Sequence, residues 1–300
     1  MKYIEKITEI YVRIDDFCKK FDNDLKKYQL QPVKKLRNRK SIMSNSEIIC
    51  LLVLFHLGGY KNLKHFYLFY VKQHLYNEFP DTVSYNRFTE LSQTVLFPMT
   101  LFLKHISQDK CTGISFVDST PLRVCHNRRI HSHKVFKQYA DRGHCSLGYF
   151  YGFKLHLIIN DKGEVLNFIL TKGNIDDRQP LLAGNLLKEV WGKVFGDKGY
   201  ISKQLFDFLF MDGIHLITKI RKNMRNTPMN LKDKLLLRKR AVIESVNDEL
   251  KNICQIEHTR HRSFGNFLAN CISGLIAYSI LPKKPSIRVE YTNSRQLALW

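Results

Sequence analysis

The sequence lacks the features by which secreted and membrane-spanning proteins are recognised. Its longest apolar runs, around 49–57 and 276–281, fall far short of the ~20 residues that a membrane span needs. The N-terminal segment, residues 1–6, is charged and contains no apolar signal core. The 7 cysteines are an odd number without a CxxC pair, which favours free thiols in a reducing compartment over a disulfide framework. We therefore expect a cytoplasmic protein with no membrane partner.

Acidic residues are scarce as well. The 300 residues hold 27 Asp and Glu against 48 Lys and Arg, which gives a net charge of +21. With 44% hydrophobic residues the chain can still bury substantial cores, and its length suits one small and one larger domain. Neutralisation of phosphates with release of counterions best explains so large a positive charge. The composition therefore predicts a globular protein that binds nucleic acid.

Residues 1–108 are expected to form an all-α domain. Apolar residues recur every three or four positions through residues 4–25, as they do on one face of a helix. Ser44 and Glu47 form a capping-box pattern at the start of a second helix that runs to Leu57. A third, aromatic-rich helix is expected over 63–79.

A short helix that begins after Ser84 presents Tyr85, Asn86 and Arg87. These side chains suit the recognition helix of a helix-turn-helix, which reads bases in the major groove of DNA. An ordinary helix of a small bundle explains the same pattern, because helix-turn-helix signals are weakly specific in a single sequence. Both interpretations stay open at this point.

From Cys111 the pattern changes to alternating strands and helices. The expected elements are strands at 114–117, 153–159, 165–170, 194–196 and 215–220, helices at 176–190 and 202–211, and a final apolar helix at 263–281 packed on the sheet. The turn signal at 160–163 makes the second and third strands a hairpin. The sequence thus predicts a mixed α/β domain over 109–282 and a tail over 283–300.

Three carboxylates occupy positions from which they could converge. Asp118 and Asp197 each follow a short apolar strand, and Glu244 lies on an amphipathic helix. Crowded carboxylates repel one another unless a cation neutralises them, and Mg²⁺ and Mn²⁺ prefer oxygen ligands. Taken singly, the two aspartates could instead cap turns, and Glu244 could belong to a solvated charged face that it shares with other charged residues. That face holds Arg240, Glu244, Asp248 and Lys251.

Two connections on either side of these carboxylates are strongly basic. The first, 123–154, has Asp141 as its only acidic residue, and the second, 219–240, has only Asp233. The cations that we expect to contact DNA phosphates are Arg128, Arg129, Lys198, Arg221, Lys222 and Arg225. The alternative for such runs is a solvated loop.

Three motifs resemble those of bacterial insertion-sequence DDE transposases. They are Phe116-Val-Asp118-Ser-Thr-Pro, Gly196-Asp197-Lys-Gly-Tyr, and Arg240-x3-Glu244-x6-Lys251. The third is similar to the family's Tyr-x2-Arg-x3-Glu-x6-Lys signature, except that Leu237 stands where the tyrosine is expected. The insertion-sequence family nine-eighty-two is the most similar group.

The resemblance implies an RNase H-like fold and a DNA transposase, in which an activated water would cut the end of the element and the freed 3′-hydroxyl would then attack target DNA. Asp118, Asp197 and Glu244 would hold two divalent ions, Mg²⁺ or Mn²⁺, with Arg240 and Lys251 on the phosphates beside the scissile bond. The partners would be double-stranded DNA, as element terminal repeats and target, bound by a homodimer or larger assembly.

Three alternative hypotheses stand beside the transposase interpretation. A metal-dependent nuclease of the same fold would cut DNA without joining it, and a non-catalytic remnant would only bind it. Within the basic connection, the Cys and His residues offer a zinc site whose spacing matches no standard finger. These residues are Cys125, His126, His131, His133, His144 and Cys145.

Overall fold

The computed structural model divides the chain into two compact units. The first combines residues 1–106 with 253–280, and the second combines 107–252 with 281–300. Within these units the structure describes residues 2–28, 41–146, 148–224, 228–257, 261–287 and 297–298. Each unit is described by itself below.

The first unit consists of helices, as the sequence predicts. Its elements are α1 (Lys2–Tyr28), α2 (Asn45–Leu57), α3 (Leu63–His65), η1 (Phe66–Val71), α4 (Lys72–His74), α5 (Tyr85–Thr94), α6 (Leu96–Ser107) and α11 (Phe264–Ile280). The predicted capping box is present: the Ser44 side chain accepts from the Glu47 N–H, and the Glu47 carboxylate accepts from the Ser44 N–H. Among the described residues, no helix is long and apolar enough to cross a membrane.

The last helix, α11, corrects one expectation. It belongs to the helical unit, where it packs against α2 and α5, and not to the sheet domain to which the sequence pattern assigned it. Buried His56 on α2 joins the two segments, because its ring nitrogens contact the Ser273 hydroxyl at 2.9 Å and the Cys254 carbonyl. The chain therefore leaves the helical unit after α6 and returns to it after residue 252.

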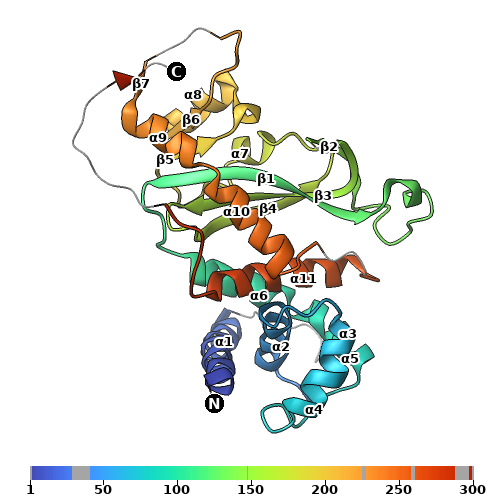
Figure 1. Cartoon of the computed structure of the whole chain (residues 1–300). Coiled ribbons are helices and arrows are strands. Elements are labelled where there is room, and N and C mark those ends of the chain that lie inside the picture. The colour runs from blue at the N-terminus through green and yellow to red at the C-terminus, as the bar shows by residue number, and fades with distance from the viewer. Residues whose placement is uncertain are drawn as a thin grey trace. The chain divides into compact units, whose positions relative to one another are not determined.

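The second unit is built on a six-stranded mixed sheet. Its strands are β1 (Ile114–Cys125), β2 (Asp141–Cys145), β3 (Gly148–Asn160), β4 (Val165–Lys172), β5 (Gly192–Gly196) and β6 (Ile214–Thr218). β3 pairs antiparallel with β1 and β4, whereas β5 is parallel to β1, and β6 is parallel to β5. The resulting order β4-β3-β1-β5-β6 is the RNase H-like arrangement that the family resemblance implies. Figure 1 shows β1 and β3 as its longest strands.

The predicted hairpin is confirmed, and two strands exceed the prediction. β3 and β4 pair across the turn that begins at Asn160. β1 continues to Cys125 instead of ending near Val117, because β3 is long enough to pair with its whole second half. β2 was not expected, since its charged sequence, Asp-Arg-Gly-His-Cys, has no strand pattern; it forms by pairing with the start of β3.

Helical segments and a short two-stranded ribbon complete the unit. They are η2 (Asn127–Arg129), α7 (Gln179–Leu182), η3 (Lys198–Tyr200), α8 (Lys203–Met211), α9 (Leu231–Lys239), α10 (Val242–Asp248) and η4 (Glu249–Ile253), and the ribbon strands β7 (Met229–Asn230) and β8 (Leu297–Ala298). α7 is much shorter than the predicted helix at 176–190. The backbone takes positive φ at Gly184 and Glu189, a conformation that ends a helix.

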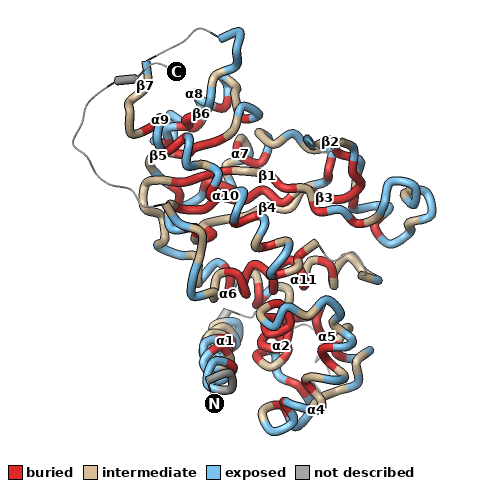
Figure 2. The backbone as a smooth tube through the Cα atoms, in the orientation of Figure 1, coloured by how far each residue is buried: buried red, intermediate tan, exposed pale blue. Residues whose placement is uncertain are grey.

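The core of this unit lies where α7 and α8 meet the sheet. Val117, Ile158 and Val194 from three strands pack with Leu181 and Leu205 from the two helices. Figure 2 shows the buried residues concentrated in the strands, while the connection from β1 to β2 is mostly exposed. The predicted tail begins in contact with this unit, since the Ile287 N–H donates to the Asp161 carbonyl; most of the tail lies outside the described residues.

One titratable group is fully buried on β3. The His156 ring is 0% exposed, and its Nε2 lies 2.8 Å from the Thr171 hydroxyl on β4. Burial lowers the pKa of His156 to about 4, and nearby Lys154 lowers it further while Asp177 opposes the shift. The folded protein therefore holds this imidazole neutral.

This burial predicts a loss of stability in mild acid. Between pH 6.5 and 4 the unfolded chain protonates His156 and the folded chain does not, so acid favours unfolding by up to about 3 kcal/mol. His156→Gln should flatten this part of the curve of unfolding free energy against pH, measured by urea denaturation at several pH values. An unchanged pH dependence in the folded variant would contradict the assignment.

Candidate active site

Asp118 and Asp197 occupy equivalent positions on two neighbouring parallel strands. The pairing of β1 with β5 ends at Phe116 and Phe195, whose rings lie 5.5 Å apart. Each aspartate follows two residues later, so by the period of a strand its side chain continues the face that carries these rings. The two strands thus direct both carboxylates to one face, at the point where the strands separate.

The local surroundings of the two aspartates differ. Asp197 caps η3, and its Oδ1 accepts from the Gly199 N–H at 2.8 Å, as the turn-capping alternative expected. Asp118 caps no turn and lies in the middle of β1, which corrects its predicted place at a strand end. The parallel pairing of β1 with β5 ends at Phe116, just before Asp118.

Glu244 lies on α10, next to the same strand. The predicted helical stretch 240–251 is divided: it begins at Val242, after a turn at 240–241 that separates α10 from α9, and it continues as the π-helix η4. Arg240 at the interruption places one guanidinium nitrogen 3.0 Å from the Glu244 carboxylate and the other 3.9 Å from Asp118. Arg240 therefore links two of the three predicted carboxylates.

Asn247 is a site residue that the sequence interpretation missed. Its Nδ2 donates to Asp118 Oδ2 at 3.1 Å, while its Oδ1 is buried without a hydrogen-bond partner. Asn247 lies three residues after Glu244, a spacing that places both on neighbouring positions of one helix face. That spacing is the signal by which it could have been found.

The predicted charged face is corrected in two places. Lys251 turns toward β1 and donates to the Pro121 carbonyl at 2.7 Å, so this ammonium anchors η4 to the strand. Asp248 is exposed and accepts from Asn252 at 2.5 Å. α10 and η4 contact β1 through Asn247 and Lys251, which are four residues apart. Asp248 does not take part in that contact. Leu237, at the family's tyrosine position, is buried in α9.

The electrostatics of the site centre on Asp118. Burial raises the pKa of Asp118 to about 7; Arg240 opposes the rise, and Asp197 and Glu244 add to it. The Tyr200 hydroxyl is buried without a hydrogen-bond partner, and burial together with the charge of Asp118 raises its pKa well above the ordinary value. Three carboxylates thus interact with one another, next to unpartnered polar atoms of Asn247 and Tyr200.

The donor set fits a hard divalent cation. Carboxylate and amide oxygens are the ligands that Mg²⁺ and Mn²⁺ prefer, and the buried Asn247 Oδ1 lacks a donor. Within the described residues, no three His, Cys, Asp or Glu side chains are grouped closely enough to hold a metal ion. In the arrangement described, Glu244 is paired with Arg240 and Asp197 with its own turn.

The alternative zinc site is not assembled either. The Cys145 thiol donates to the Gly148 carbonyl, His144 packs against Tyr149, and His133 packs against Phe136. Over the described ranges, these Cys and His side chains form no metal-binding group.

The other predicted DNA contacts lie on exposed surface of the sheet unit. Arg128 and Arg129 form η2, Lys198 follows Asp197, and Arg221 and Lys222 follow β6. In the part of the chain that the structure describes, none of these five cations forms an ion pair. Arg225 lies outside the described residues.

The helical unit contains a separate cleft of about 330 Å³. Tyr85 and Asn86, at the start of α5, line it together with Lys64, His261 and Arg262. Burial raises the pKa of the Tyr85 hydroxyl, and Arg262 opposes this shift. No acidic residue is found among the described residues that line the cleft. His261 and Arg262 were not predicted, because they lie far from α5 in the sequence.

The connection before α5 differs from a helix-turn-helix. α4 ends at His74 and α5 begins at Tyr85, whereas the motif joins its helices by a turn of only a few residues. Arg87, the third predicted reader, is exposed and pairs with Glu90 at 2.8 Å. The bundle-helix interpretation therefore describes the connection better, while Tyr85 and Asn86 remain on accessible surface.

Comparisons with known proteins give one family match and several distant structural likenesses. A piggyBac transposase synaptic complex with hairpin DNA shares 12% identity and a TM-score of 0.48, over 90% of this chain and 71% of that chain. A Mos1 transposase paired-end complex with left transposon end shares 12% identity and a TM-score of 0.25, over 85% and 82%. No curated protein sequence matches.

The family match covers nearly all of the first segment of the sheet unit, with its candidate site, and the start of the segment that returns to the helical unit. Residues 108–264 match the model described as "Transposase DDE domain". The matched segment is more than half of the 300 residues and contains all three motif carboxylates. The chain therefore belongs to the transposase DDE domain family.

Proposed function

We propose that this chain cleaves DNA at the ends of a mobile element and joins the freed 3′-hydroxyl to target DNA. The observation that supports the proposal is that Asp197 and Glu244 both lie near enough to buried Asp118 to raise its pKa. Carboxylates this near to one another are costly unless cations neutralise them, and such cations are the catalysts of metal-assisted phosphoryl transfer.

Divalent ions held by the three carboxylates would activate the attacking hydroxyl and stabilise the leaving oxygen. The chain's own residues have separate tasks around them. Asn247 fixes the orientation of Asp118 by its hydrogen bond. Arg240 Nη1 lies 3.9 Å from Asp118 without a hydrogen bond, so the guanidinium would turn to a phosphate oxygen once a cation neutralises the carboxylates. Lys251 holds η4 on β1 and so keeps Asn247 in place.

The transposase family and the DNA partners are proposed from the motifs and from the distribution of charge. The three motifs together with the layout of nearly the whole chain support membership of the insertion-sequence family nine-eighty-two. Exposed unpaired cations on the sheet unit and the cationic cleft of the helical unit support binding of terminal repeats and target DNA. Assembly of two or more chains on the two ends of an element completes the proposal.

The carboxylates can be tested one charge at a time. Asp118→Asn, Asp197→Asn and Glu244→Gln should each reduce Mg²⁺- or Mn²⁺-dependent cleavage by at least about a hundredfold and leave duplex binding intact. Asp248→Asn is the matched control and should retain cleavage, because Asp248 is exposed away from Asp118. The assay is cleavage and joining of a labelled duplex made from the DNA that flanks the coding region. Retained cleavage in folded Glu244→Gln would refute the triad, and cleavage without joining would favour a nuclease.

The role of Asn247 predicts a shift in metal requirement. Asn247→Ala leaves Asp118 Oδ2 without its donor, so the Mg²⁺ concentration for half-maximal cleavage should rise by roughly 10- to 100-fold. Asn252→Ala, which removes an exposed amide from the same helical segment, should not change it. Equal effects of the two variants would show that Asn247 acts only through the stability of the helix.

The cleft predicts how the helical unit contributes to affinity. Arg262→Ala should weaken binding to all duplexes alike and lower the slope of log affinity against log salt by about one, as loss of one phosphate contact does. Asn86→Ala should instead alter the preference among sequences. Lys104→Ala, exposed on α6 outside the cleft, is the control. An unchanged salt slope in folded Arg262→Ala would remove the cleft from the DNA interface.

A further inference from the structure

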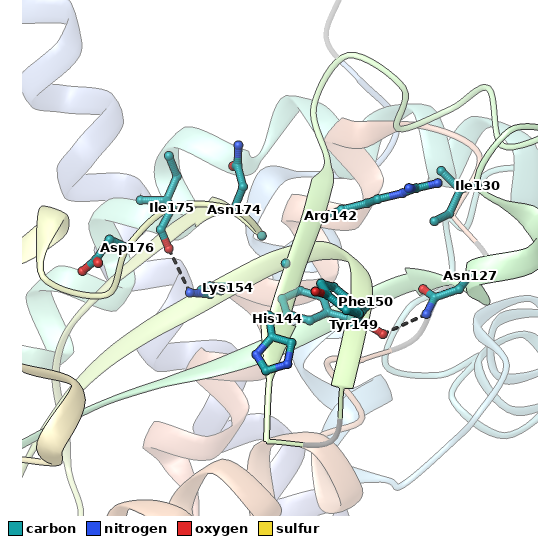
Figure 3. Close-up of a pocket in the computed structure, with 12 residues that line it drawn as sticks. Asn127, Ile130, Arg142, His144, Tyr149, Phe150, Lys154, Asn174, Ile175 and Asp176 are labelled. Atoms are coloured by element: carbon teal, nitrogen blue, oxygen red, sulfur yellow. Dashed lines mark hydrogen bonds between the residues drawn. The ribbon is translucent and has the colours of Figure 1, made fainter.

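A groove of about 750 Å³ lies on the sheet unit, away from the three carboxylates. It runs between the β2–β3 hairpin and the segment that follows β4, as Figure 3 shows. Two glycines allow this close approach: a Cβ on Gly143 of β2 would meet the Gly173 carbonyl at 2.2 Å. Backbone contact between β2 and the segment after β4 thus forms one part of the groove wall.

The charge of the groove is positive. Arg142 on β2 lines it and forms no ion pair in the part of the chain that the structure describes. The acidic lining residue, Asp176, is already neutralised by Arg178 at 2.6 Å. Asn127, another lining residue, shares the short helix η2 with unpaired Arg128 and Arg129. An anionic ligand in the groove would therefore meet Arg142 without a competing free carboxylate, and the two η2 arginines follow the lining residue Asn127 in the chain.

One rim of the groove carries an exposed aromatic ring. Tyr149 is 73% exposed, although an aromatic side chain is normally buried. The Asn127 amide donates to the Tyr149 backbone carbonyl at 2.8 Å, and the His144 ring packs edge-on against the Tyr149 ring at 5.0 Å. Figure 3 shows His144 and Tyr149 together at this end of the groove, with Asn127 beside them. A held, solvent-exposed ring next to unpaired cations is the arrangement on which unpaired nucleobases stack.

We propose that this groove binds unpaired nucleotides of a DNA end, with a base on the Tyr149 ring and phosphates on Arg142 and the η2 arginines. The inference rests on the proposed function, since it takes a DNA end to be the substrate. Paired bases within a duplex present no free face to a ring, so duplex DNA would gain only the phosphate contacts.

The groove and the candidate active site lie on the same pair of strands. Leu157 of β3 pairs with Asp118, and Tyr149 lies eight residues earlier on β3, so the rise of a strand separates Tyr149 from Asp118 by roughly 26 Å. Lys154 lines the groove nearer to Asp118, but it pairs with Pro121 and so points to the opposite face of the sheet from Asp118. Lys154 itself is held by the Ile175 carbonyl and the Asp177 carboxylate, so it supports the wall of the groove and is not its free cation.

The test compares two probes with the full chain by fluorescence anisotropy at one fixed salt concentration. One is a blunt duplex of about twenty base pairs, and the other is the same duplex with a single-stranded tail of about five nucleotides. The wild type should bind the tailed probe more tightly. Tyr149→Ala should weaken binding of the tailed probe by roughly 5- to 150-fold and leave the blunt probe unchanged, whereas Tyr149→Phe should keep the wild-type affinity.

Controls separate this inference from the proposed function. Tyr149 is exposed, so its truncation leaves no buried cavity, and Phe210→Ala removes a ring that is 63% exposed on α8 and should change neither affinity. Equal affinity of the wild type for both probes, or an equal loss on both in Tyr149→Ala, would overturn the groove assignment alone. Failure of the wild type to bind either probe would overturn the proposed function, and the groove assignment with it.

Discussion

Burial of the Asp118 carboxylate is the constraint on which the sheet unit depends. A charge that is only 22% exposed needs partners, because desolvation favours its neutral form. Arg240 and Asn247 supply two of them, and both come from the segment that follows α9. The interruption at 240–241 and the π-helix η4 are the departures from a regular helix by which this segment reaches β1, where Lys251 fixes it to the Pro121 carbonyl. Helical irregularities of this kind occur often at functional sites.

The features that the sequence predicts well are those whose causes are local. The capping box at Ser44 and Glu47 is decided within four residues, and the β3–β4 hairpin by the turn that begins at Asn160. The two strand-associated aspartates are predictable for a related reason: each follows an apolar run that needs a buried strand. The two aspartates lie at equivalent positions because β1 and β5 pair in parallel.

The features that the sequence does not reveal depend on contacts between distant segments. Asn247 donates to a residue 129 positions away, and its spacing from Glu244 is the single local feature that points to it. α11 is apolar enough to pack on either a sheet or a helix bundle, and periodicity alone cannot choose between them. β2 has no apolar alternation, because backbone pairing with β3 and not burial of its side chains holds it in place.

The position of the unpaired cations follows from the sign of the charge at the candidate site. A DNA phosphate that approaches Asp118 meets two further carboxylates, and Arg240 is already shared between Asp118 and Glu244. Most of the affinity for DNA must therefore arise elsewhere on the chain. The exposed arginines of η2, the groove at Tyr149 and the cleft at Arg262 meet this requirement, because none of them adjoins a free carboxylate on the surface that would bind the phosphate. The surfaces that bind the DNA backbone are separate from the site that acts on it. One chain can therefore hold DNA firmly although its three carboxylates face the reacting bond.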